Sequence, residues 1–241
     1  MSAFRPGLGP TLVVLALLPV LVGLGLWQLS RAEEKRQMLA AFDARRIATP
    51  VDVEQLATSP DPAYLRVRLQ GHFDAEHSLL LDSRIRDGKA GVELLQPFQS
   101  SGGQWLLVNR GWLPWPDRRV APVFSTPDGA QDLSAWAYVP PGAVFELKHL
   151  ETSGWPKLVN QVDAAALWQH LGRNGLPLEL RLEEGPAGYR TDWPIVAMGP
   201  EKHIGYAVQW FALATALLGL FIYFGLRKAR ENDNEPSTRH A

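Results

Sequence analysis

The chain has no cysteine among its 241 residues. This absence excludes disulfide bonds, thiolate metal sites, covalent attachment of a c-type haem and cysteine redox chemistry. The chain also has no large excess of charge of either sign, because its 24 Lys and Arg nearly balance its 25 Asp and Glu, which gives a formal net charge of −1. The composition therefore predicts no nucleic-acid partner.

Motifs of the common enzyme classes are missing too. The sequence has no H-E-x-x-H or H-x-x-x-H spacing, no G-x-S-x-G nucleophile elbow and no Walker-type phosphate loop. These absences disfavour a self-contained hydrolase or a nucleotide-hydrolysing enzyme. We therefore predict that the protein is not an enzyme and assign no catalytic residue.

Two apolar runs are present that are long enough to cross a membrane, although the mean hydropathy of −0.10 is that of a soluble chain. Residues 11–29 contain no charge over 19 positions, and residues 204–226 contain none over 23. About 20 apolar residues span the roughly 30 Å hydrocarbon core, so both runs predict transmembrane helices. Pro19 is tolerable inside a membrane helix. No A-x-A-like cleavage site follows the first run, so we expect it to be retained rather than removed as a signal peptide.

The two runs divide the chain into five parts. We predict a cytoplasmic N-terminus (1–10), a first transmembrane helix (11–29), a β-rich domain (30–203), a second transmembrane helix (204–226) and a cytoplasmic tail, basic and then disordered (227–241). Lys and Arg are almost equally frequent on the two membrane faces, so the positive-inside rule alone leaves the orientation open. Because long domains translocate largely regardless of charge, we place the central domain in the periplasm. The lack of an Arg- and Ser-rich leader favours a bacterial inner membrane.

The central domain has the pattern of short strands separated by turns. A helix-friendly stretch, residues 31–46, first continues the membrane helix. Strand-length runs follow at 64–70, 77–83, 92–98, 104–108 and 178–183. A short helix is expected at 164–171, with Asp163 as its N-cap and Gly172 at its end. We therefore predict a membrane protein in which two transmembrane helices flank a mostly antiparallel β domain, barrel or sandwich-like, with a minor helix.

The predicted topology brings polar and aromatic residues together at the domain-side ends of the two helices. They are Trp27, Gln28 and Arg31 in the first helix and His203, Tyr206 and Trp210 in the second. Spacings of three and four place Gln28 and Arg31, with Lys35, on one helical face, and His203, Tyr206 and Trp210 on another. Small residues of the second helix are expected to let another helix or a flat ligand approach: Gly205, Ala212, Ala216 and Gly219.

Two interpretations of this cluster stay open. Trp, Tyr, Lys and Arg form the ordinary interfacial belt of membrane helices, and a histidine at a helix start can meet headgroups and water. Alternatively the cluster binds a haem, with His203 as iron ligand, aromatic rings as walls and cations for the propionates. The positive end of the helix dipole disfavours a protonated His203, which keeps the imidazole in the neutral form that metals need.

The same flanks carry a resemblance to a known family. Its segments occur in order as Gly25-Leu-Trp27-Gln28-Leu-Ser-Arg31 with Lys35, Gly71-His-Phe73, Arg84 with Gly91 and Pro97, Val108-Asn-Arg-Gly-Trp-Leu-Pro114, Pro156-Lys-Leu-Val-Asn160 and His203-Ile-Gly-Tyr-Ala-Val-Gln-Trp-Phe211. Each segment is weak alone, but the patterns W-Q-x-x-R, N-R-G-W-x-P and H-x-x-Y-x-x-x-W together are specific. The chain resembles the Surfeit-locus (Shy-type) family of cytochrome c oxidase assembly factors, in the form of a bacterial member.

This resemblance implies a non-catalytic assembly factor for haem–copper terminal oxidases. Bacterial relatives bind haem a through a histidine of the second membrane helix, and His203 is the matching position here. The resemblance further implies insertion of haem a into oxidase subunit I, with subunit I, haem a synthase and membrane lipid as partners. It also implies that the central domain is periplasmic.

Three other functions remain as alternatives. A structural factor would stabilise an oxidase intermediate without carrying a cofactor. A membrane enzyme would need a close ionisable pair, for which His203 and Glu201 are the obvious residues. Copper delivery is disfavoured, because the chain has no Cys and three Met as soft ligands.

The N-R-G-W-L-P segment of the central domain has its own physical interpretation. Asn109-Arg110-Gly111 breaks a period-two run, which indicates a bulge or a tight approach at Gly111 and an inward-facing Trp112. A structural turn and a docking site for a partner are both compatible with this pattern. Arg110 is also a candidate to reach the propionates of a haem.

Overall fold

The computed structural model of the 241-residue chain describes residues 4, 6–140 and 154–233. The chain divides into two compact units. The β domain extends from Ala41 to Pro194, and the helix pair comprises the residues up to Ala40 and those from Ile195 onward. The β domain is thus inserted in the chain between two apolar helices, as the segregated hydropathy predicts.

Two long helices, α1 (Leu8–Arg46) and α4 (Pro200–Asp233), form the helix pair, and the last residues of α1 belong to the β domain. With 39 and 34 residues they are roughly 58 and 51 Å long, more than the ~30 Å hydrocarbon core. Their most apolar windows have mean hydropathies of 2.3 and 1.8, and 11% of each window is buried. By length and composition both helices are able to cross a membrane, as predicted.

The ends of the two helices differ in part from the prediction. α1 passes through Pro19 and continues without a break over the helix-friendly stretch 31–46, as expected. α4 begins at Pro200, where the fixed φ of proline suits the first helical position, and it continues to Asp233. Disorder was predicted directly after Arg230, which is wrong for residues 231–233; residues 234–241 lie outside the described residues.

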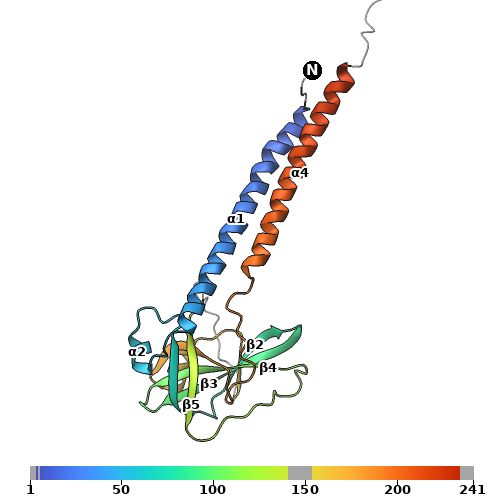
Figure 1. The fold of residues 1–241 in the computed structure, drawn as a ribbon. Helices are drawn as coiled ribbons and strands as arrows, with labels where there is room; N and C mark the ends of the chain where they lie inside the picture. Colours follow the sequence, from blue (N-terminus) through green and yellow to red (C-terminus); the bar gives the residue numbers. More distant parts are fainter. Residues whose placement is uncertain (1–3, 5, 141–153, 234–241) are drawn as a thin grey trace, which may run out of the picture. The chain divides into compact units, whose positions relative to one another are not determined.

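The described part of the β domain contains a seven-stranded sheet and two short helices. The strands are β1 (Arg66–Phe73), β2 (Leu79–Arg86), β3 (Lys89–Ser100), β4 (Trp105–Pro114), β5 (Gln131–Tyr138), β6 (Lys157–Val159) and β7 (Gly175–Leu182). The helices are α2 (Val53–Thr58) and α3 (Ala164–Leu171). Figure 1 shows the strands wrapped around one another rather than stacked in two flat layers.

The sheet closes on itself as a small barrel. Its strand order is β1-β5-β7-β4-β3-β2-β6, and an additional β1–β3 pairing joins the first five strands into a ring. Of the pairings, β2–β6 and β4–β7 are parallel and the others are antiparallel. The closure occurs at Gly71, where a Cβ would lie 1.9 Å from the carbonyl oxygen of Gln99. The mostly antiparallel prediction is confirmed, and the barrel is the form that the domain takes.

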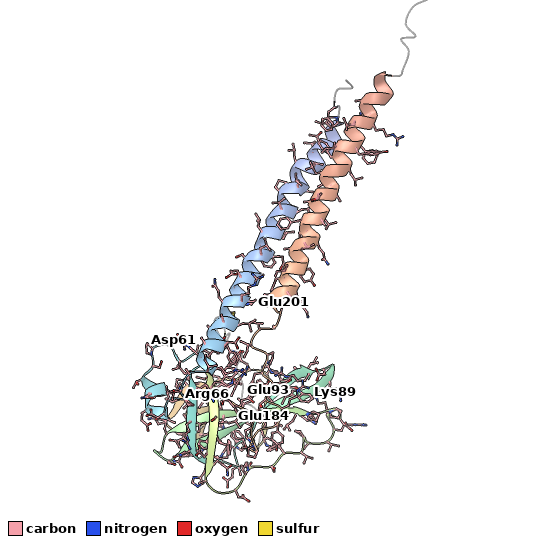
Figure 2. The ribbon with its side chains drawn as sticks, viewed as in Figure 1. Asp61, Arg66, Lys89, Glu93, Glu184 and Glu201 are labelled. Carbon is pink, nitrogen blue, oxygen red and sulfur yellow. The ribbon has the colours of Figure 1, made fainter. Side chains whose placement is uncertain are left out.

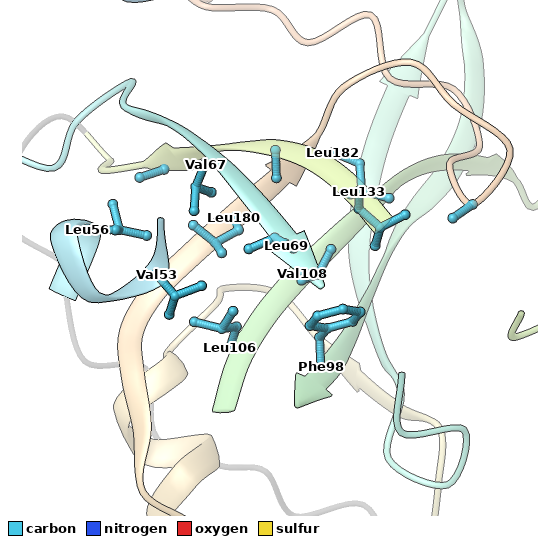
Figure 3. Packing of buried hydrophobic residues seen from close by; sticks show 13 residues of the cluster. Val53, Leu56, Val67, Leu69, Phe98, Leu106, Val108, Leu133, Leu180 and Leu182 are labelled. Carbon is cyan, nitrogen blue, oxygen red and sulfur yellow. The ribbon is translucent and has the colours of Figure 1, made fainter. Parts of the chain in front are cut away.

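The barrel interior is filled by the inward-facing side chains of its strands. In β1 the buried Val67 and Leu69 alternate with residues that face outward, which is the period-two pattern of a half-buried strand. Figure 3 shows these residues packed against Phe98, Leu106 and other members of the same cluster. Each fully buried side chain of this size contributes about 1.5–3 kcal/mol, so the barrel is held mainly by this core.

A second apolar cluster lies under α3. The predicted helix is confirmed with its stated bounds: the side chain of Asp163 accepts a hydrogen bond from Ala166 N, and Gly172 adopts the left-handed conformation that ends the helix. Leu167 and Trp168 of this helix are buried against residues of β2, β3 and β4, namely Leu79, Leu81, Leu95 and Leu107. α3 therefore covers this face of the sheet, and the sequence pattern alone did not indicate which element covers it.

Gly91 supplies a test of the packing between β3 and β4. A Cβ at Gly91 would lie 2.2 Å from Leu113 O and 2.4 Å from the indole nitrogen of Trp112. We expect Gly91→Ala to lower the free energy of unfolding by about 1–3 kcal/mol, because the close-packed neighbours must shift. Gly185→Ala is the matched control, since a Cβ at Gly185 would have nothing within 4 Å. Thermal unfolding of the full chain in detergent, followed by tryptophan fluorescence, measures both; equal midpoints for the two variants contradict the assigned contact.

Candidate functional site

His203 lies in the first turn of α4 and is hydrogen bonded across the helix pair to α1. Its Nδ1 is 2.7 Å from Oε1 of Gln28. Because an amide oxygen only accepts, Nδ1 donates, and in the neutral ring Nε2 then has the lone pair that binds metals. Both side chains are half-buried. Two residues singled out in the sequence, 175 positions apart, are therefore in direct contact.

The other four predicted site residues do not join this contact. The guanidinium of Arg31 lies 5.8 Å from the centre of the Trp27 ring, so these two form a cation–π pair on the surface of α1. Trp27 and Tyr206 are 51% and 44% exposed within the protein. Trp210 is half-buried. The structure thus brings Gln28 and His203 together and leaves two aromatic rings facing the surroundings of the helix pair.

The cations of the predicted site already have an acidic partner. Arg31 and Lys35 both bind the carboxylate of Glu34, Lys35 through Nζ at 3.3 Å. The side chains of Arg31 and Glu34 are each 44% exposed. An exposed pair of this kind is worth about 0–1 kcal/mol, so another carboxylate displaces Glu34 at small cost.

The pair His203 and Glu201, considered as an enzyme site, is not formed. The ring of His203 is hydrogen bonded to Gln28, whereas Glu201, labelled in Figure 2, is exposed at the start of α4. Among the described residues no group of three or more His, Asp or Glu is placed to hold a metal ion. The described part of the helix pair therefore offers a single imidazole as a metal ligand.

The small residues of α4 fall into a buried set and an exposed set. Gly205, Ala212, Ala216 and Gly219 are exposed, so they do not face α1, and the approach of another helix or a flat ligand to them stays a prediction. The buried small residues of α4 are Ala207, Ala214, Gly225 and Ala229. The reason is the helical phase set by His203: positions four and eleven residues later fall on its face, whereas positions two and nine residues later point away.

The Asn109-Arg110-Gly111-Trp112 segment is part of the domain core rather than a turn. Asn109 Nδ2 donates to the carboxylates of Glu93 and Glu179, each at 2.9 Å. Arg86 pairs with the other oxygen of Glu93 at 3.4 Å, and Arg181 pairs with the same oxygen of Glu179 at 2.8 Å. Both glutamates are buried, Glu93 at the position labelled in Figure 2, so Asn109 is the neutral link between two ion pairs.

Arg110 points to the opposite side of β4 and is 2% exposed. Its guanidinium donates to three neutral oxygens: Gln96 Oε1 at 2.6 Å, and the carbonyls of Ser125 and Ala187 at 2.7 Å. Burial lowers the pKa of the Arg110 guanidinium. Because these bonds lie inside the β domain, Arg110 is a structural residue, and the suggestion that it reaches propionates is wrong.

Gly111 and Trp112 complete the segment. Gly111 has φ +110°, and a Cβ there would lie 2.7 Å from the carbonyl oxygen of Arg190, which confirms the predicted tight approach. Trp112 is buried as expected, and its indole Nε1 donates to Arg84 O at 2.9 Å. β4 nevertheless continues to Pro114, because its last residues still pair with β3 beyond a register shift at this point.

A histidine of the β domain has an acidic partner of its own. His77 Nδ1 lies 2.7 Å from Asp74 Oδ2, and Arg173 Nη1 reaches the same oxygen at 2.6 Å. Burial acts to raise the pKa of Asp74, but the hydrogen bonds from Arg173 and His77 outweigh it and hold that pKa below its usual value. The side chain of Asp74 is 9% exposed, so this arrangement is an internal link between the β1–β2 connection and the segment after α3.

The β domain also contains an open pocket of about 1060 Å³ that sequence reasoning missed. Its wall includes the rings of Trp136 and Trp193 and the ion pair between Arg66 and Glu183, whose atoms are 2.7 Å apart. Arg66 and Glu184 are labelled in Figure 2. The hydrogen bond to Glu183 raises the pKa of Arg66. Because the charges on its wall are largely paired, the pocket shows no preference for a ligand of one sign.

The fold and the site together define a class of protein: a two-helix membrane protein with a small β barrel inserted between its helices and a hydrogen-bonded histidine at the start of the second. The sequence model of the SURF1 family matches residues 15–215. The chain therefore belongs to the SURF1 family, which confirms the resemblance.

Relatives in this family differ in how much of the chain they cover. A SURF1-like protein of Rickettsia bellii is 32% identical over 87% of this chain and 88% of its own length. One from Rickettsia felis is 25% identical over 88% of this chain and 95% of its own length. The "Cytochrome oxidase assembly protein SHY1" of Saccharomyces cerevisiae is 30% identical over 41% of this chain and 26% of its own length. The two bacterial relatives therefore match most of the chain, whereas the yeast protein matches less than half of it.

Gly25 tests the contact between the helices. A Cβ at Gly25 would lie 2.6 Å from the ring of Phe211 in α4, whereas nothing lies within 4 Å of one at Gly23, two residues earlier. We expect Gly25→Ala to lower the thermal midpoint of the full chain in detergent, by the equivalent of about 1–3 kcal/mol, because the Phe211 ring must shift out of its contact with α1. Gly23→Ala adds the same methyl group to the same helix and should leave the midpoint unchanged or slightly raised. A similar decrease of the thermal midpoint in both variants would contradict the assigned contact.

Asp74 predicts an acid dependence of stability. Because its folded pKa is lowered, its stabilising effect is complete above the unfolded pKa, about 3.9, and is lost as pH falls through the folded value. We expect Asp74→Asn to lower the unfolding free energy by about 1–3 kcal/mol at pH 7, and the gap to wild type to shrink below pH 4. Thermal midpoints between pH 7 and pH 3 measure this, with the exposed Asp128→Asn as control. A gap that stays constant over this range contradicts the prediction.

Proposed function

We propose that this protein is an assembly factor for a haem–copper terminal oxidase. Its membership of the SURF1 family supports this, together with the name of the yeast relative as a cytochrome oxidase assembly protein. A non-catalytic role accords with a site built from one imidazole, one amide and surface aromatic rings. The partners that follow from the proposal are oxidase subunit I, haem a synthase and the surrounding membrane lipid.

We further propose that haem a is the cargo, bound at the domain-side ends of α1 and α4 with His203 as iron ligand. The observation that carries this step is the hydrogen bond from His203 Nδ1 to Gln28, which leaves the Nε2 lone pair available. Trp27, Tyr206 and Trp210 supply rings around this position, and two of them are exposed. Arg31 and Lys35 have the exposed Glu34 as their acidic partner, and a propionate can replace it at small cost.

The proposal includes a location. We place the β domain in the periplasm and both termini in the cytoplasm of a bacterial inner membrane. The length of the β domain supports this placement, because long domains translocate largely regardless of flanking charge. Fusions of a reporter that is active only in the periplasm, made after Gly185 and after Arg230, distinguish the two orientations.

A second candidate function is a structural assembly factor that carries no cofactor. The Gln28–His203 hydrogen bond favours it as well, because a polar contact within an apolar helix pair stabilises helix association by about 0.6–2 kcal/mol without any ligand. In that case both side chains serve the fold. The two functions differ in whether haem stays with the purified protein.

The deciding experiment is an absorption spectrum of the full chain, purified in detergent after co-production with haem a biosynthesis. We expect a Soret band that is lost in His203→Ala, because the axial ligand is removed. His72→Ala is the control, since His72 is exposed on β1 in the other unit. No Soret band in wild type, or an unchanged band in His203→Ala, would refute haem ligation by His203 and favour the cofactor-free function.

A further inference from the structure

The partner of His203 is a neutral amide at the end of the first apolar run of the chain. Gln28 stands near the end of a run that contains no charge from residue 11 to residue 29. A polar side chain in such a place is costly unless it is hydrogen bonded. Its Oε1 is satisfied by the imidazole at 2.7 Å. Gln28 and His203 therefore restrain one another, whatever else binds.

This contact also selects one tautomer of the ring. A free neutral imidazole carries its proton on either nitrogen, and a proton on Nε2 blocks that atom as a ligand. An acceptor fixed opposite Nδ1 holds the proton there and fixes the ring plane. Second-shell partners of this kind typically change metal affinity by about 10- to 100-fold.

We propose that Gln28 is a positioning residue: it sets the tautomer and orientation of His203 and thereby tunes how strongly Nε2 binds the iron of a haem. The proposal rests on the proposed function, because it assumes that His203 is the ligand. It also explains why the acceptor opposite Nδ1 is an amide. A carboxylate acceptor raises the basicity of the imidazole and strengthens the iron bond, whereas a neutral amide orients the ring without that increase. A protein that transfers its haem to another protein needs an iron ligand that is correctly oriented but also dissociates from the iron.

The test uses ferric haem (haemin) titrated into the full chain in detergent, with two readouts: the dissociation constant from the Soret band and the midpoint potential of the bound haem. Gln28→Leu removes the acceptor, and we expect binding about 10- to 100-fold weaker. Gln28→Glu keeps an acceptor and adds charge, and we expect tighter binding, slower haem release and a more negative potential. Gln28→Leu adds no charge, so a shifted potential of the haem that it still binds reports the lost hydrogen bond to the imidazole, whereas a purely structural role leaves that potential unchanged.

Gln209→Leu is the matched control, because Gln209 is an exposed glutamine of α4 near the same helix ends. It should bind haemin as wild type does. If Gln28→Leu fails to fold, Gln28→Asn replaces it, because Asn is also neutral and its shorter side chain withdraws the acceptor from Nδ1 of His203. Unchanged affinity and potential in Gln28→Glu, with binding lost in His203→Ala, overturn the positioning role alone. Unchanged binding in His203→Ala overturns the proposed ligand itself, and with it both proposals.

Discussion

Two buried polar residues at the centre of β4 constrain the β domain, because their buried donors need acceptors. Asn109 and Arg110 point to opposite sides of the strand, and an unpaired group at either position would cost about 1–3 kcal/mol or more. Asn109 joins the ion pairs of Glu93 and Glu179, and Arg110 needs carbonyls from two segments outside the sheet. Those two segments are therefore tied to β4, and the N-R-G-W motif links parts of the domain that are distant in sequence.

The helix pair obeys a different constraint, because lipid offers no hydrophobic drive for helices to associate. Close contact must come from small residues and from polar links. Gly25 provides the first by making room for Phe211, and the Gln28–His203 hydrogen bond provides the second. The two features lie one turn apart on α1, so the residues that hold the helices together are also those that shape the proposed site.

How much of the fold and of the candidate site could be predicted depended on how far apart in the sequence the residues that form each feature lie. Local signals succeeded: the charge-free runs, and α3 with Asp163 and Gly172 at its ends. α2 was missed although Asp52 and Gln55 form a capping box, a signal that identifies such a helix. β5 was missed as well, because alanines supply much of its buried face and they are weak strand formers. Closure at Gly71 joins strands distant in sequence, which periodicity does not reveal. The two-helix topology predicted that Gln28 and His203 lie at one end of the helix pair, but not that they are hydrogen bonded.

A residue committed to satisfying its buried neighbours is not available to a ligand, and this separates the motifs of the chain by role. Arg110 has the charge to bind a propionate, but removing it from Gln96 and two carbonyls would leave buried oxygens unpaired. To bind a propionate, Arg31 and Lys35 would lose only their contacts with the exposed Glu34. His203 uses one ring nitrogen for Gln28 and keeps the other. The groups that can be offered to a cargo are thus in the helix pair, whereas the polar groups of β4 are committed to the fold of the β domain.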